Sequence, residues 1–119
     1  MIVIWPLAFK FARGERGRRC NRFEFELYRR VNEQRRAMLC PAICCTRSGS
    51  LLVARAARPL TEDEGRRLIA SKGFPDWDYM PGDESEPFEY KSSDWGWLGV
   101  KLVALDYSAP ALFADDETA

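Results

Sequence analysis

The groups of this sequence that could do chemistry are four cysteines, eighteen carboxylates and eighteen basic side chains, and the chain contains no histidine. Without imidazole, the Ser-His-Asp and Cys-His nucleophile systems and the His-containing zinc sites are excluded. The glycine-rich phosphate-binding patterns G-x-x-x-x-G-K-[ST] and G-x-G-x-x-G are absent as well. We therefore expect a protein that is not an enzyme and that uses no cofactor.

The cysteines do not form a convincing metal site. Cys40, Cys44 and Cys45 give a C-x₃-C-C pattern whose remaining possible partner is the distant Cys20. Structural zinc sites usually present two spaced pairs, and neighbouring residues of a strand point to opposite faces. We expect no metal and interpret the cysteines as small buried side chains in a reducing compartment.

The most unusual stretch of the sequence interleaves seven aromatic rings with seven carboxylates, and we call residues 74–97 the acidic-aromatic segment. Its rings are those of Phe74, Trp77, Tyr79, Phe88, Tyr90, Trp95 and Trp97. Its carboxylates are those of Asp76, Asp78, Asp83, Glu84, Glu86, Glu89 and Asp94. Three prolines predict a long irregular loop over residues 74–96, and the aromatic content argues against disorder. Either the rings fold inward as a lid, or they form an interface, since Tyr and Trp dominate interface hot spots.

The function predicted from this segment is non-enzymatic protein interaction. We expect it to present aromatic anchors and carboxylates to the basic surface of another protein, as a small inhibitor or immunity-type protein would. The predicted protein-binding residues are Asp76, Trp77, Asp78, Tyr79, Asp83, Glu84, Asp94, Trp95 and Trp97.

Two other functions remain open. Residues 1–59 carry 13 basic and 4 acidic side chains, whereas residues 60–119 carry 5 and 14. A nucleic-acid-binding module could use four arginines of the basic half, Arg13, Arg16, Arg18 and Arg19, to contact phosphates. A small-molecule-binding or enzymatic domain could instead form a dimer pocket near Trp95 and Trp97, with Asp94 as a perturbed carboxylate. A homodimer is also expected to cover exposed aromatic side chains.

The length of 119 residues predicts a single domain. No stretch approaches the ~18 apolar residues of a membrane span, and the first eleven residues lack the pattern of a signal peptide. We therefore expect no membrane association and a cytoplasmic location.

The predicted elements that position these groups begin with a strand over residues 2–11, where apolar residues alternate on both sides. An arginine-rich loop over 12–20 follows, and then a helix over 21–39 with Asn21 as its N-cap. One face of this helix is apolar and carries Phe23, Leu27, Tyr28, Val31 and Met38. Short apolar runs at 42–46 and 51–56, joined by a Ser/Gly-containing turn, predict a hairpin.

The C-terminal half begins with a helix that starts at the Thr61 and Glu64 capping box and closes at Gly73 as its C′ residue. A strand over 97–107, apolar on both faces, is typical of a central strand. The chain then ends with a helical turn around 110–113 and a frayed tail over 114–119.

Taken in order, these elements predict an α+β domain with the β-α-β-β-α-β order of a ferredoxin-like sheet, its two helices on one face. In that fold the first and last strands lie at the centre of the sheet. If residues 23–28 form a strand instead, the alternative is a β-meander with one packed helix.

Overall fold

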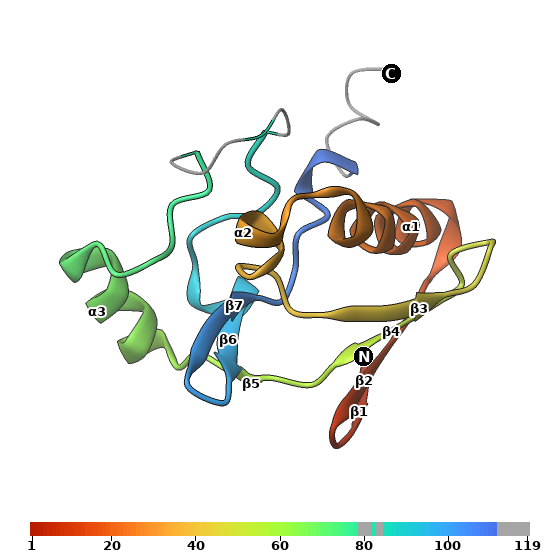
Figure 1. Cartoon of the computed structure of the whole chain (residues 1–119). Coiled ribbons are helices and arrows are strands. Elements are labelled where there is room, and N and C mark those ends of the chain that lie inside the picture. The colour runs from red at the N-terminus through yellow and green to blue at the C-terminus, as the bar shows by residue number, and fades with distance from the viewer. Residues whose placement is uncertain (79–81, 83–84, 112–119) are drawn as a thin grey trace.

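The computed structural model describes residues 1–78, 82 and 85–111, and these residues form helices and two antiparallel sheets (Figure 1). The four-stranded sheet, sheet A, has the order β1-β2-β4-β3 and contains β1 (Ile2–Ile4), β2 (Leu7–Phe11), β3 (Ala42–Cys45) and β4 (Leu51–Arg55). The three-stranded sheet, sheet B, contains β5 (Arg58–Pro59), β6 (Trp95–Leu98) and β7 (Lys101–Ala104). The helices are α1 (Gly14–Arg30), α2 (Glu33–Arg36), α3 (Glu62–Ser71) and the 3₁₀ helix η1 (Ser92–Asp94). The predicted α+β class is confirmed.

The N-terminal residues form a hairpin, so the prediction of one continuous strand over 2–11 is wrong. Strands β1 and β2 pair in antiparallel register, with Val3 opposite Ala8, on either side of a cis Trp5–Pro6 peptide bond. Pro6 has no N–H to give to a sheet. Its carbonyl instead accepts a hydrogen bond from the N–H of Ala56 at 2.8 Å.

Helix α1 begins at Gly14, so the predicted loop over 12–20 and the predicted N-cap at Asn21 are wrong. The side chain of Asn21 is buried and donates to the carbonyls of Lys10 at 3.0 Å and Gly49 at 2.9 Å. A Cβ at Gly49 would lie 2.2 Å from the Arg18 carbonyl oxygen, so only glycine allows this turn to approach the helix. These long-range contacts favour helix in a stretch whose arginines read locally as a loop.

The predicted helix over 21–39 is confirmed as far as Arg30, where α1 ends. Asn32 then caps the short α2, its side chain accepting from the N–H of Arg35 at 2.9 Å. Leu27, Val31 and Met38 of the predicted apolar face are buried in the core, although Val31 and Met38 lie beyond the end of α1.

The central hairpin and α3 agree with the sequence. Thr61 and Glu64 form the expected capping box, with hydrogen bonds of 3.1 and 3.0 Å. The C-terminal end differs by one residue: Lys72, with φ +55°, takes the left-handed position assigned to Gly73. Gly73 donates instead to the Leu68 carbonyl at 2.9 Å, as the following residue of a Schellman motif does.

The predicted central strand over 97–107 is a second hairpin, and that prediction is wrong. Strands β6 and β7 reverse at Gly99, which has φ +65°, next to the almost fully exposed Val100. Residues 109–111 are helical, consistent with the start of the predicted turn. Phe113 and the predicted tail lie outside the described residues.

The ferredoxin-like order is not confirmed, and the sheet is not a β-meander either. The first strand lies at an edge of sheet A, and the last two strands belong to sheet B. The sheets meet where Leu39 bridges Ala104, through the hydrogen bonds Cys40 N–H to Ala104 O and Ala104 N–H to Met38 O, each 2.8 Å. The main core gathers α1, sheet B and the acidic-aromatic segment around this junction. Within the described residues, no helix has the length and apolar character to cross a membrane.

Candidate functional site

The described rings of the acidic-aromatic segment belong to the core or pack against it, as the lid interpretation predicts. Trp77 and Trp95 have no exposed surface, and Phe88 is 4% exposed. Phe88 is central to the cluster, with ring centroids 5.7 Å from Trp77, 4.8 Å from Trp95 and 5.5 Å from Tyr90. Edge-to-face contacts of this kind stabilise beyond the burial of area. Trp77 and Trp95 therefore position the segment from within and are inaccessible to a partner.

Trp77 is also held by an arginine. The Arg35 guanidinium lies 4.5 Å from the centre of the Trp77 ring, and its Nη2 donates to the Trp77 carbonyl at 3.3 Å. Arg35 is 3% exposed. The short helix α2 therefore anchors the first half of the segment to the core.

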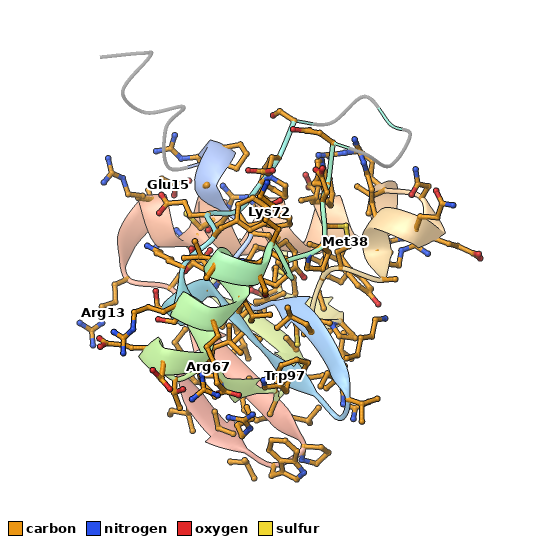
Figure 2. All side chains as sticks on the ribbon, turned by 90° about the vertical axis from the view of Figure 1, so that its left-hand side faces the viewer. Arg13, Glu15, Met38, Arg67, Lys72 and Trp97 are labelled. Atoms are coloured by element: carbon orange, nitrogen blue, oxygen red, sulfur yellow. The ribbon has the colours of Figure 1, made fainter. Side chains whose placement is uncertain are left out.

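Trp97 is tied to α3. Its Nε1 donates to Glu64 Oε2 at 3.1 Å, and Glu64 also accepts two hydrogen bonds from the Arg58 guanidinium at 3.0 and 3.1 Å. These donors lower the pKa of Glu64 to about 2, the Arg58 hydrogen bonds contributing most and the Thr61 N–H next. Figure 2 shows the face of the molecule that carries α3, with Lys72 towards one end of the helix and Trp97 on the neighbouring sheet.

The carboxylates of the segment divide into exposed and buried groups. Asp76 and Asp78 are exposed and lie on the outside of the segment. Asp94 is buried, and its pKa rises to about 6 because of burial and the charge of Asp106, although Lys91 lies 3.8 Å away. Three further predicted binding residues, Tyr79, Asp83 and Glu84, lie outside the described residues.

An open groove lies between α3 and the acidic-aromatic segment. It has a volume of about 400 Å³ and is lined by Leu68, Ile69, Lys72, Phe74, Pro75, Asp76, Glu86 and Tyr90. Ile69 is 56% exposed. The Tyr90 hydroxyl donates towards Glu86 and the Pro75 carbonyl, at 3.0 and 3.2 Å. The groove thus combines an apolar floor with two carboxylates.

The four arginines of the predicted nucleic-acid site lie at the start of α1 and not in the predicted loop. Arg13 is the N-cap residue of α1, and Arg16, Arg18 and Arg19 lie within the helix. Arg18 is paired with Glu15 at 3.0 Å. The four residues thus share the N-terminal end of one helix.

The four cysteines are free thiols in different places. Cys40 is buried, whereas Cys44 is exposed on the edge strand β3. A β-bulge at Ile43 shifts the register there, so that Cys44 pairs with Val53. Among the described residues, no three Cys, Asp or Glu side chains are arranged to hold a metal ion.

A surface that the sequence analysis did not identify is the outer face of sheet A. Helix α1 covers one face of this sheet, while no described element covers the other (Figure 1). The outer face carries eight apolar or thiol side chains and one charge, from Ile2, Ile4, Leu7, Phe9, Phe11, Cys44, Leu51, Val53 and Arg55. Ile2, Ile4 and Phe11 are 54%, 65% and 57% exposed. The signal in the sequence was the strand at 2–11 with apolar residues on both sides.

Comparison of the chain with protein-family models, with curated proteins and with solved structures finds no match.

Proposed function

We propose that the protein is a non-enzymatic protein-interaction domain whose main contact surface is the outer face of sheet A. The observation that carries this proposal is the uncovered apolar face itself. An antiparallel sheet with one solvated face normally alternates apolar-in and polar-out. Here strands β1, β2 and β4 place isoleucine, phenylalanine, leucine and valine on the outside.

The shape of this face also fits a protein partner. The row Ile2, Phe9, Val53 and Cys44 crosses all four strands, which makes the apolar surface continuous. Contiguous exposed apolar patches mark interaction sites in proteins that are otherwise well packed. The one charged strand residue of the face, Arg55, favours a partner that sets a carboxylate beside its own apolar side chains.

The groove at the acidic-aromatic segment supports a second contact. Asp76 and Glu86 line an apolar floor that includes the exposed Ile69. This combination suits an arginine or lysine side chain whose aliphatic stem lies on Ile69. An inhibitor or immunity-type protein that binds a basic partner segment would use the groove in this way.

Position-specific photo-cross-linking tests both contacts. The photoreactive residue p-benzoylphenylalanine replaces Phe11 or Ile4 on the outer face, or Ile69 in the groove. Val100 at the β6–β7 turn is the control position. The variants are expressed and irradiated in cells of the source organism. The proposal expects one defined adduct with another protein from Phe11 and Ile4 and none from Val100.

The other outcomes are equally informative. An adduct from Ile69 alone would show that the partner binds at the groove and not at the outer face. Replacing Asp76 and Glu86 by lysine should then abolish the adduct. Glu26→Lys on α1 is the control and should leave the adduct unchanged. Adducts with a second copy of this chain would identify the partner as the chain itself. No adduct from any of the three test positions would overturn the proposal.

A further inference from the structure

A partly open apolar cavity lies between the two sheets, on the side of sheet A opposite to the outer face. Its volume is about 270 Å³. Its walls come from β1, β2 and β4, from residues 56–59 and from the chain that follows β7: Met1, Val3, Trp5, Ala8, Lys10, Cys40, Ala54, Arg55, Ala56, Ala57, Arg58, Pro59, Leu105 and Tyr107. The site is distinct from the groove and does not include Trp95 or Trp97.

The cavity follows from the sequence of the sheet. Val3, Ala8 and Ala54 are paired across three strands and form one row on the inner face. Ala56 and Ala57 continue the wall where the chain leaves sheet A for sheet B. The small alanine side chains of these walls leave the space between the two sheets unfilled. Protein interiors rarely leave voids much larger than a water molecule, and an engineered apolar cavity of about 150 Å³ stays dry and binds benzene.

The floor of the cavity carries a fixed polar group. Lys10 Nζ donates to Glu24 Oε2 at 2.9 Å and to the Leu105 carbonyl at 2.7 Å. A lysine ammonium has three N–H donors, so a third is left for an acceptor in the cavity. The Tyr107 N–H donates to the other Glu24 oxygen at 3.2 Å. Because Glu24 balances the charge of Lys10, an anion gains no net attraction there.

The same groups point to binding and not to covalent chemistry. Burial alone would lower the pKa of Lys10, but the adjacent Glu24 carboxylate raises it overall, so the ammonium persists at neutral pH. Burial also raises the pKa of the Cys40 thiol to about 11. Neither group is a nucleophile at neutral pH.

We propose that this cavity binds a neutral, mostly apolar small molecule, about the size of two fused aromatic rings, with one hydrogen-bond acceptor that faces Lys10. This site goes beyond the proposed protein-interaction function and does not depend on it, because its strand walls Val3, Ala8 and Ala54 lie on the inner face of sheet A. Arg55, at the end of β4, borders both surfaces.

Three probes of similar size test the proposal on the full chain: 2-acetylnaphthalene has a neutral acceptor, 2-ethylnaphthalene has none, and 2-naphthoate is an anion. Binding is followed by NMR of alanine methyl groups. We expect 2-acetylnaphthalene to shift the methyl signals of Ala8, Ala54 and Ala56 and to leave that of Ala70 on α3 unchanged. It should bind about fivefold more tightly than 2-ethylnaphthalene, the effect of one net hydrogen bond, and more tightly than 2-naphthoate.

Two variants locate the site. Ala54→Leu fills the cavity and should weaken binding of 2-acetylnaphthalene at least tenfold. Because Ala54 is buried and this variant could lose its fold, Val3→Trp offers a second block at the mouth, where Val3 is 51% exposed. Ile2→Trp, one residue away on the outer face, is the matched control and should bind normally. Binding that is unchanged in both blocking variants, tightest binding of the anion, or no methyl shift with any probe would overturn the proposal.

Discussion

The acidic-aromatic segment and the N-terminal hairpin place their apolar side chains in opposite ways. Residues 74–97 contain seven carboxylates and read as a surface loop, yet Trp77, Phe88 and Trp95 are almost completely buried. Residues 1–5 contain no charge and read as core, yet Ile4 and Trp5 are 65% and 69% exposed. Burial in this molecule therefore follows where the chain is tethered and not how apolar a segment is.

The tethers explain the difference. The described parts of the segment are fixed by specific contacts, including the Arg35 guanidinium on Trp77 and the hydrogen bond from Trp95 Nε1 to the Glu89 carbonyl at 2.9 Å. The hairpin has a single neighbouring strand, because β1 is the edge of sheet A. A cluster of rings with satisfied polar atoms contributes stability. An exposed apolar edge contributes a surface for binding, which natural sheets otherwise protect with charge.

The largest expected effect comes from removing a ring of the cluster. Trp95→Ala should lower the free energy of unfolding by about 3–5 kcal/mol, because it leaves a cavity among Phe74, Phe88 and Tyr90. Trp5→Ala, the same change in the hairpin, should cost no more than about 0.5 kcal/mol. Urea denaturation measures both. Similar losses for the two tryptophans would contradict the difference in packing between the segment and the hairpin.

A nearly equal loss of unfolding free energy is expected where Lys10 of β2 pairs with Glu24 of α1. Lys10→Met leaves the Glu24 carboxylate buried, with side-chain exposure of 5%, and without its partner. We expect a loss of about 3 kcal/mol at pH 7, the lower end for breaking a buried pair because Lys10 itself is 23% exposed. The loss should shrink at pH 4, where Glu24, whose pKa burial raises, takes up a proton. An equal loss at both pH values would contradict the pairing.

What the sequence could predict depends on how local the signal is. The capping box of Thr61 and Glu64, the hairpin at residues 42–56 and the apolar face at Leu27 are predicted from residues that lie close together in the chain. The start of α1 is not predictable locally, because Asn21 is held by its hydrogen bond to the Gly49 carbonyl, 28 residues away. The chain reverses direction at Pro6 and at Gly99. Both turns lie inside apolar runs whose alternation predicts one uninterrupted strand.

The candidate sites show the same limit. The acidic-aromatic segment was identified from composition, which gives the residues but not the direction in which each ring points. The cavity and the outer face could not be identified, because both depend on which face of sheet A the helix covers. The row of Val3, Ala8 and Ala54 exists only once the strand order β1-β2-β4 is known.

A smaller effect, a gain in the free energy of unfolding, is expected from replacing Asp94, the buried carboxylate of the acidic-aromatic segment. In the folded protein the pKa of Asp94 is about 6, above the usual value of 3.8. The folded state therefore holds a proton between pH 4 and 6 that the unfolded state has lost, so this group reduces stability as pH rises through that window. Asp94→Asn should raise the free energy of unfolding at pH 7 by about 1 kcal/mol, after a discount for solvent screening. Between pH 4 and 7, the melting temperature of this variant should depend less on pH than that of the parent protein. No gain at pH 7 would mean that Lys91, 3.8 Å away, compensates the charge in full.

The smallest expected change in stability tests the hairpin and the face beyond it. Phe11 is 57% exposed at the end of β2 and pairs with Leu51 across the sheet. Phe11→Thr keeps a residue that favours strands, so the free energy of unfolding should change by no more than about 0.5 kcal/mol. The variant should nevertheless bind less of an apolar dye such as 8-anilinonaphthalene-1-sulfonate, because it removes one of the largest side chains from the outer face of sheet A. A clear loss of stability with unchanged dye binding would show that Phe11 belongs to the packed core, and the apolar edge would then follow the same rule as the acidic-aromatic segment.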